Sequence, residues 1–149
     1  DRAVRLAKMN LAAHGLSVPD EYRHPIPPVE HAAYEAARQI MALPEPPTAL
    51  FALNGSMAVG TYRALKDMGV RIPQDVSLVA FDDYPWTSLV DPGIDVLEQP
   101  IEEMGRAAAE ILFDAIDRDG VATERRRFPA RLIVRGSCAA PRREVQALR

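Results

Sequence analysis

Apolar residues along this chain recur with two different spacings, which predict alternating helices and strands. Helical spacing is found in four segments, over residues 2–14, 30–42, 57–68 and 101–117. Short apolar runs, typical of strands covered on both faces of a sheet, span residues 48–53, 76–81, 94–98 and 131–135. The alternation of these elements predicts an α/β fold built on a mainly parallel sheet.

Proline marks the joints between the predicted elements. The sequence contains 13 prolines, and four of them lie at element boundaries: Pro28, Pro44, Pro73 and Pro100. Proline cannot donate a backbone hydrogen bond, so it ends helices and is excluded from central strands. After the Asn-Gly turn at residues 54–55, Ser56 is expected to cap the helix over residues 57–68.

The length and composition indicate about one globular domain. The 149 residues are 48% hydrophobic and 26% charged, enough to bury a core without disulfides or metals. The single cysteine, Cys138, excludes a disulfide within the chain and is expected to be a small packed residue. The net charge of −3, without a dense basic stripe, argues against a stand-alone nucleic-acid binder. No apolar run approaches the roughly 20 residues of a membrane span, and no signal peptide opens the sequence.

Polar residues follow two of the predicted strands at their carboxyl ends. Asn54 follows the strand over residues 48–53, and Asp82 and Asp83 follow the strand over residues 76–81. Ligands of open α/β sheets bind beyond the carboxyl ends of the strands, so these side chains are expected to converge on one ligand. A carboxylate there can accept hydrogen bonds from two neighbouring hydroxyls of a sugar or nucleoside.

Each of these residues also has an ordinary structural interpretation. The two aspartates are equally typical of a turn, and the run Asn54-Gly55-Ser56 on local sequence is more typical of a helix cap than of a ligand contact. Trp86 either stacks on the apolar face of a sugar or is half-buried packing. A metal or acid–base pair would need further carboxylates or histidines close by, and a nucleophile motif is missing. We therefore expect neither an enzyme nor a metal or cofactor site.

Several motifs in register resemble the LacI/GalR family of bacterial transcription regulators. They are PTALFALN at residues 47–54, MAVG at 57–60, GVRIPQDVSLVAFDD at 69–83, QP at 99–100, MG at 104–105 and RLIVRGS at 131–137. Their order and spacing hold over residues 48–137, whereas residues 2–47 fit more loosely. Agreement among several motifs makes this resemblance specific.

The resemblance implies a three-layer α/β lobe of the periplasmic binding protein-like I fold. It implies that residues 1–149 are the carboxyl-terminal part of a sugar-type effector-binding domain in a cytoplasmic repressor. Asp82 matches the family's hydroxyl-binding aspartate, and Asn54 matches an asparagine at the cleft. The first lobe and the helix-turn-helix that binds operator DNA are expected to lie outside this chain. A periplasmic-type sugar-binding protein for transport or chemotaxis is the alternative, and an enzyme using Asp82 and Asp83 is a third.

The sequence departs from the family pattern at three positions around the expected cleft. Gly55 stands where the family usually has aspartate, and Pro28 stands where an aromatic residue sometimes closes the cleft. The arginine that commonly reaches the effector falls at Ala3, which makes nearby Arg2 the candidate contact. These departures indicate either an unusual effector or weak binding.

The resemblance also implies two contact surfaces. The helix over residues 101–118 would normally pack on the first lobe, so we expect its apolar stripe, which includes Met104 and Leu112, to pack on its own lobe or on another copy. The family forms homodimers through a surface that matches the helices over residues 30–42 and 56–68 and the strand after the Asp82 loop. The candidate interface residues are Tyr34, Arg38, Met41, Tyr62 and Leu89, each of which is otherwise ordinary surface or core packing.

Overall fold

The computed structural model describes residues 25–117 and 125–140, with residues 12, 13, 15, 17, 19 and 22. Its elements are α2 (Glu30–Met41), β1 (Ala49–Ala52), α3 (Gly55–Asp67), β2 (Ser77–Phe81), the 3-10 helix η2 (Pro85–Ser88), β3 (Asp95–Glu98), α4 (Ile101–Asp117) and β4 (Arg131–Ile133). These agree with the predicted helices and strands to within two residues at each end. Of the helix expected over residues 2–14, the structure describes only residues 12 and 13, which are helical, and Arg2 lies outside the described residues.

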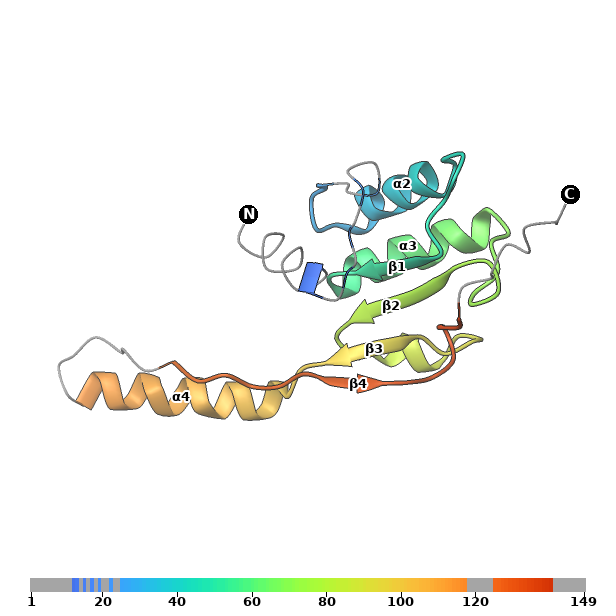
Figure 1. Cartoon of the computed structure of the whole chain (residues 1–149). Helices are drawn as coiled ribbons and strands as arrows, with labels where there is room; N and C mark the ends of the chain where they lie inside the picture. The colour runs from blue at the N-terminus through green and yellow to red at the C-terminus, as the bar shows by residue number, and fades with distance from the viewer. Residues whose placement is uncertain are drawn as a thin grey trace, which may run out of the picture.

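The four strands form one sheet in the order β1-β2-β3-β4 (Figure 1). The first three are parallel, and β4 runs antiparallel to β3. The prediction of a mainly parallel sheet is therefore confirmed. Because β1, β2 and β3 run in the same direction, their carboxyl ends lie along one edge of the sheet, which we call the ligand edge.

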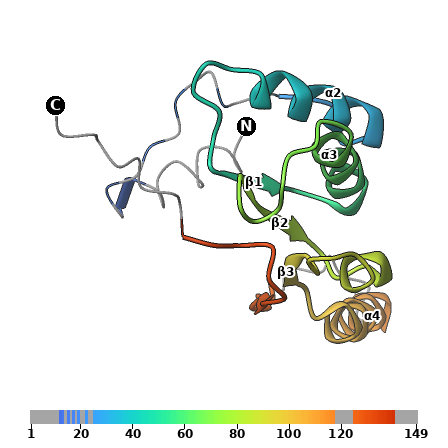
Figure 2. The ribbon, with the colours of Figure 1, turned by 90° about the vertical axis from the view of Figure 1, so that its right-hand side faces the viewer.

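Helices α2 and α3 cover one face of the sheet (Figure 2). Between them lies a core whose fully buried members include Leu65 of α3 and Leu78 and Val96 of the strands. The two helices approach most closely at Gly60, where an added Cβ would lie 3.0 Å from both the carbonyl carbon of Glu30 and the amide nitrogen of Tyr34. Glycine is what permits the backbones to come this close.

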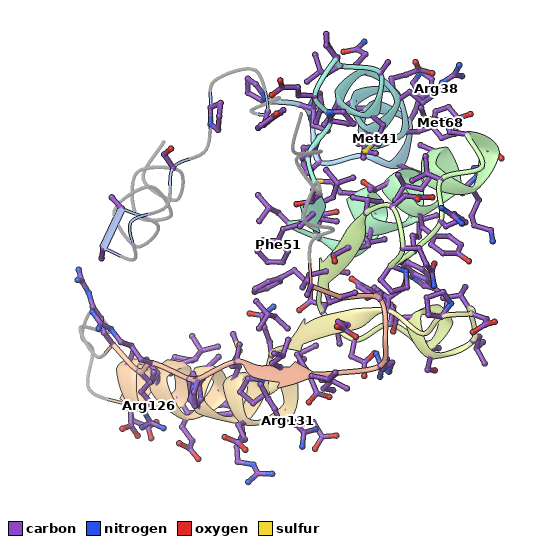
Figure 3. The ribbon with its side chains drawn as sticks, turned by 45° about the vertical axis from the view of Figure 1, so that its right-hand side comes forward. Arg38, Met41, Phe51, Met68, Arg126 and Arg131 are labelled. Atoms are coloured by element: carbon purple, nitrogen blue, oxygen red, sulfur yellow. The ribbon has the colours of Figure 1, made fainter. Side chains whose placement is uncertain are left out.

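The opposite face of the sheet is more open than the sequence suggested. Phe51 projects from β1 away from α2 and α3 and is 48% exposed, whereas Ala52 beside it is buried (Figure 3). The expectation that the strands are covered on both faces is wrong for β1. The physical reason is that successive side chains of a strand point to opposite faces, and α2 and α3 lie on only one of them.

Helix α4 leaves the sheet at the ligand edge and extends away from it (Figure 1). Within this fully described helix only Ala107 is buried, while Met104 is 37% and Leu112 58% exposed. The expectation that this stripe packs on its own lobe is wrong, because α4 begins only three residues after β3 ends and continues outward. Its burial against another copy stays a prediction.

Candidate ligand-binding site

The register of the sheet brings Asn54 and Asp82 to neighbouring positions at the ligand edge. In the parallel pair of β1 and β2, Ala52 lies opposite Ala80, and each candidate residue follows two positions later on its own strand. Both are half-buried. Parallel pairing therefore places the two residues at neighbouring strand ends, and the convergence of their side chains on one ligand stays a prediction.

Asp82 is held in an unusual backbone conformation. Its φ of 71° lies in the left-handed region, the only such value among the described non-glycine residues. Its amide donates a 2.9 Å hydrogen bond to the Leu97 carbonyl, and Gln99 Nε2 donates one of 2.7 Å to Asp82 Oδ1. Strained backbone fixed by its surroundings is typical of functional positions. A carboxylate has acceptor sites beyond the one that Gln99 occupies, so Asp82 can still accept hydrogen bonds from ligand hydroxyls.

Asn54 is the cap of α3. Its Oδ1 accepts a 2.8 Å hydrogen bond from the amide of Met57, and the helix begins at Gly55. The expectation that Ser56 caps this helix is wrong by two positions, because the extended backbone needed at a cap is found at Asn54. Capping uses only the carbonyl oxygen of the side chain, so the Asn54 amide group retains two donors for a ligand.

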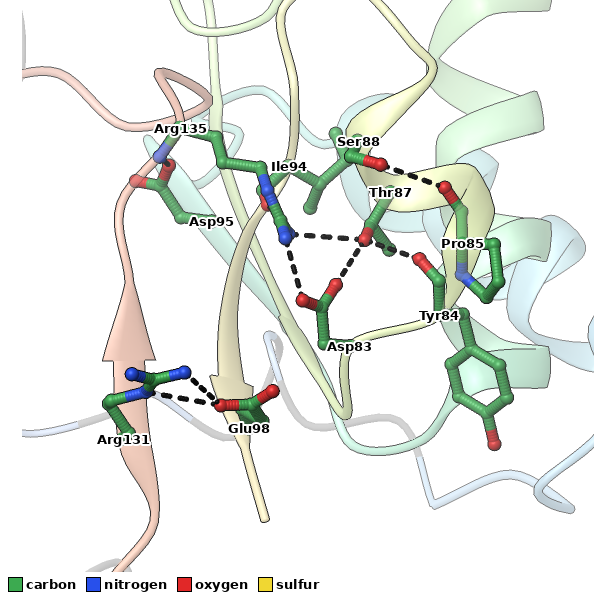
Figure 4. A network of polar contacts seen from close by, with 10 residues as sticks. All are labelled: Asp83, Tyr84, Pro85, Thr87, Ser88, Ile94, Asp95, Glu98, Arg131 and Arg135. Atoms are coloured by element: carbon green, nitrogen blue, oxygen red, sulfur yellow. Dashed lines mark hydrogen bonds and ion pairs between the residues drawn. The ribbon is translucent and has the colours of Figure 1, made fainter. Parts of the chain in front are cut away.

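Asp83 has a different partner from its neighbour. Its Oδ2 accepts a 2.6 Å hydrogen bond from Arg135 Nη2, and its Oδ1 accepts one of 2.7 Å from the Thr87 hydroxyl (Figure 4). The hydrogen bond from Arg135 is the main reason that the pKa of Asp83 lies below its ordinary value. The two aspartates therefore have different partners, and Asp83 links its own loop to the turn after β4.

A second buried carboxylate, Asp95, organises the turn after β4. Its Oδ1 accepts hydrogen bonds from the amides of Arg135, Gly136 and Ser137 at 2.6, 2.7 and 3.3 Å. Burial acts to raise the pKa of Asp95, but these amide hydrogen bonds outweigh it and the pKa is lowered. Sequence reasoning missed Asp95. The turn itself was indicated only by the run Arg135-Gly136-Ser137, in which glycine and serine are typical turn residues.

The turn ends at Cys138, which is exposed rather than packed as expected. Its Sγ lies 3.8 Å from the Leu78 carbonyl oxygen. Although the residue as a whole is exposed, partial burial of its thiol raises the pKa of Cys138 to about 11, and the nearby Asp95 carboxylate adds to this effect. The thiol is therefore protonated near neutral pH.

Trp86, the expected aromatic contact of the ligand, and Tyr84, two residues before it, have different surroundings. The Trp86 ring lies 5.8 Å from that of Tyr62, centroid to centroid, and packs at the border of the core. This is the half-buried packing that the sequence left open for it. The Tyr84 ring instead lies against Gly55, next to Asn54. Sequence reasoning missed Tyr84, although its position two residues after Asp82 was a usable signal.

The candidate interface residues lie on and beside the α2–α3 layer. The Tyr34 hydroxyl donates a 2.9 Å hydrogen bond to Asp67, and the Arg38 guanidinium lies 5.7 Å from the centre of the Tyr34 ring. Met41 and Tyr62 pack against the core, whereas Leu89 is 82% exposed. Of the five candidates, Leu89 is the apolar side chain with the largest exposed fraction.

The described residues also form a groove away from the candidate site. A groove of about 400 Å³ lies at the end of α3 remote from the ligand edge, lined by residues that include Lys66, Arg71 and Asp91. Within the described part of the chain, no cluster of three or more histidine, cysteine, aspartate or glutamate side chains is placed to hold a metal ion. No described helix is long and apolar enough to cross a membrane.

Comparison with known proteins identifies a matching family and a similar transcriptional repressor. Residues 1–138 match the family described as a periplasmic binding protein-like domain. The transcriptional repressor CytR of Escherichia coli is 36% identical over 109 residues, which cover 73% of this chain and 32% of CytR. The chain thus spans about a third of that relative's length.

Solved structures agree with this assignment. A LacI-type transcriptional regulator from Bacillus cereus matches with a TM-score of 0.83 and 26% identity, covering 93% of this chain and 50% of that one. A LacI family regulator from Enterococcus faecium, solved with bound ribose, matches with a TM-score of 0.68 and 30% identity, covering 80% of this chain and 43% of that one. These relatives are regulators, which favours that interpretation over a transport protein.

Proposed function

The chain belongs to the periplasmic binding protein-like family of LacI-type transcriptional regulators, and from that premise we propose that it forms the carboxyl-terminal lobe of an effector-binding domain. The effector is a sugar or a related small metabolite with neighbouring hydroxyls. The lobe binds this molecule and does not transform it. Asp82 and Asn54 provide the polar contacts at the ligand edge.

One observation carries this proposal. Asp82 stands at the end of a central parallel strand, in a left-handed backbone conformation, with its carboxylate oriented by Gln99. A charged acceptor whose direction is fixed in this way selects a pair of hydroxyl donors by geometry. Ribose in the Enterococcus faecium regulator is a ligand of this chemical class.

The proposal extends to regulation. A ligand held between this lobe and a second one favours a closed arrangement of the two, and this shifts the population of DNA-binding states. The operator is contacted by a helix-turn-helix that, in this proposal, lies outside the 149 residues, and two copies pair through the α2–α3 layer with Leu89. The exposed apolar face of α4 would then be the surface that meets the first lobe.

A titration of the full-length gene product tests the proposal. Free pentoses, hexoses, disaccharides and nucleosides are titrated by calorimetry, and each that binds is added to the protein on its operator fragment. We expect at least one of these compounds to bind and to change the affinity for the operator. If none of them binds, the proposed function is wrong. A bound compound that is chemically converted would contradict the binding-only role.

A further inference from the structure

Tyr84 adjoins both candidate polar contacts of the site, one through the backbone and one through its ring. Its backbone follows Asp82 by two residues, and its ring rests on Gly55, the residue after Asn54. We propose that Tyr84 is a specificity-determining residue, whose ring forms the apolar wall against which the CH face of the bound sugar ring packs. This inference rests on the proposed function and adds to it the surface that recognises the non-hydroxyl part of the ligand.

The ring has this position because residue 55 has no side chain. A Cβ built on Gly55 would lie no more than 2.8 Å from three ring carbons of Tyr84. Gly55 is buried at the first position of α3, where its backbone is an ordinary helical one that does not itself require glycine. The glycine therefore serves close approach of the aromatic ring rather than backbone conformation.

The orientation of the ring suits ligand contact. It points away from the network of Asp83, Thr87 and Arg135, toward the edge where β3 ends (Figure 4). The side chain is 45% exposed, and among the described residues the Tyr84 hydroxyl has no hydrogen-bond partner. A large aromatic surface left half-open beside oriented polar groups is typical of a small-molecule site.

The base of Tyr84 is rigid. Its carbonyl oxygen accepts a 3.0 Å hydrogen bond from the amide of Thr87 and lies 2.6 Å from the hydroxyl oxygen of the same residue. Thr87 is fully buried and is tied to Asp83. The backbone that carries the ring is therefore held in a fixed relation to Asp82, which favours binding of a ligand by limiting the positions of the ring.

Together the two side chains define a ligand chemistry. Asp82 accepts hydrogen bonds from hydroxyls at the rim of a ring, and Tyr84 presents an apolar surface to a ring face. A cyclic sugar carries both features, with polar groups around its edge and CH groups on its faces. An acyclic polyol has the hydroxyls but lacks a ring face, so we expect it to be discriminated against.

Three variants of the full-length gene product test this inference, with D-ribose as the first probe and the sugars that bind the unaltered protein as further probes. Tyr84→Ala is expected to weaken binding about tenfold, whereas Tyr84→Phe retains affinity to within about threefold. Gly55→Ala is expected to displace the ring and weaken binding while leaving the melting temperature unchanged or higher, because alanine favours a helix more than glycine does.

The outcomes separate this inference from the proposed function. If Tyr84→Ala and Gly55→Ala both bind as the unaltered protein does, while Asp82→Asn loses affinity, Tyr84 is not part of the site and the proposed function stands. If the unaltered protein binds none of the probes, both are overturned. Melting temperatures of all variants show whether weak binding is caused by loss of folding. If Tyr84→Ala is unfolded, Gly55→Ala provides the test: weaker binding supports the role of Tyr84, and unchanged binding contradicts it.

Discussion

The guanidinium of Arg135 donates a 2.6 Å hydrogen bond to the carboxylate of Asp83, a residue 52 positions earlier in the chain. Both side chains are about four-fifths buried, at 20% and 22% exposure. The pair joins the turn after β4 to the loop that carries Asp82 and Tyr84. The geometry of the ligand edge thus depends on a contact made by the far end of the sheet.

Replacing Arg135 by lysine is expected to lower the free energy of unfolding by about 2 kcal/mol. A lysine ammonium cannot reach the Asp83 carboxylate, the Thr87 hydroxyl and a backbone carbonyl at once, as the guanidinium of Arg135 does. Urea denaturation followed by circular dichroism measures the change. The matched control is Arg131→Lys, in an ion pair with Glu98 whose arginine is 75% exposed, where we expect no more than about 0.5 kcal/mol. Equal losses in the two variants would contradict the assigned role of Arg135.

The same pair predicts a pH dependence. The hydrogen bond from Arg135 holds the pKa of Asp83 below its ordinary value of 3.8. A carboxyl group whose pKa is lower in the folded state contributes stability that is complete above the unfolded value and is lost as the pH falls through the folded value. The loss of unfolding free energy below about pH 4 should therefore be smaller in Asp83→Asn than in the unaltered chain. Parallel pH profiles for the two proteins would show that this carboxylate is not responsible.

The close approach of α2 and α3 predicts that Gly60→Ala destabilises the fold. The added methyl group would meet the backbone of Glu30, which cannot move aside as a flexible side chain can. We expect a loss of about 2 kcal/mol, because overpacking outweighs the better helix propensity of alanine. Gly105→Ala in α4 is the control, since nothing lies within 4 Å of its added Cβ, and it should cause no loss. A neutral Gly60→Ala would mean that the two helices are not packed as described.

Cys138 is expected to be unreactive despite its exposure. Burial of the thiol, with the nearby Asp95 carboxylate, raises the pKa of Cys138 to about 11, so little thiolate is present at pH 8. Alkylation by iodoacetamide at pH 8 should be slower in the folded chain than in urea, where the pKa returns to its ordinary value. Equal rates in the two states would contradict this environment for the thiol.

Much of the fold could be predicted from the sequence because the relevant signals are local. Helical spacing, short apolar runs and prolines defined the described helices and strands to within two residues. The neighbouring positions of Asn54 and Asp82 follow from the parallel direction of β1 and β2, which a sequence of alternating elements implies.

The parts that could not be predicted depend on contacts between distant segments. The pairing of Asp83 with Arg135 and the three amides on Asp95 join positions about 40 or more residues apart, and no spacing rule connects them. The place of the Tyr84 ring depends on the missing side chain of Gly55. The exposure of Phe51 and of α4 depends on which faces other segments cover, which apolar patterns alone do not specify.

The most direct test of the proposed site is the affinity of Asp82→Asn for the sugar that binds the full-length gene product. Asparagine has the same shape as aspartate and tolerates the left-handed backbone at this position, so the fold and the melting temperature should be unchanged. Loss of the charged acceptor is expected to weaken binding about 10- to 100-fold in a calorimetric titration. An affinity equal to that of the unaltered protein would contradict the central claim that Asp82 binds the hydroxyls of the effector.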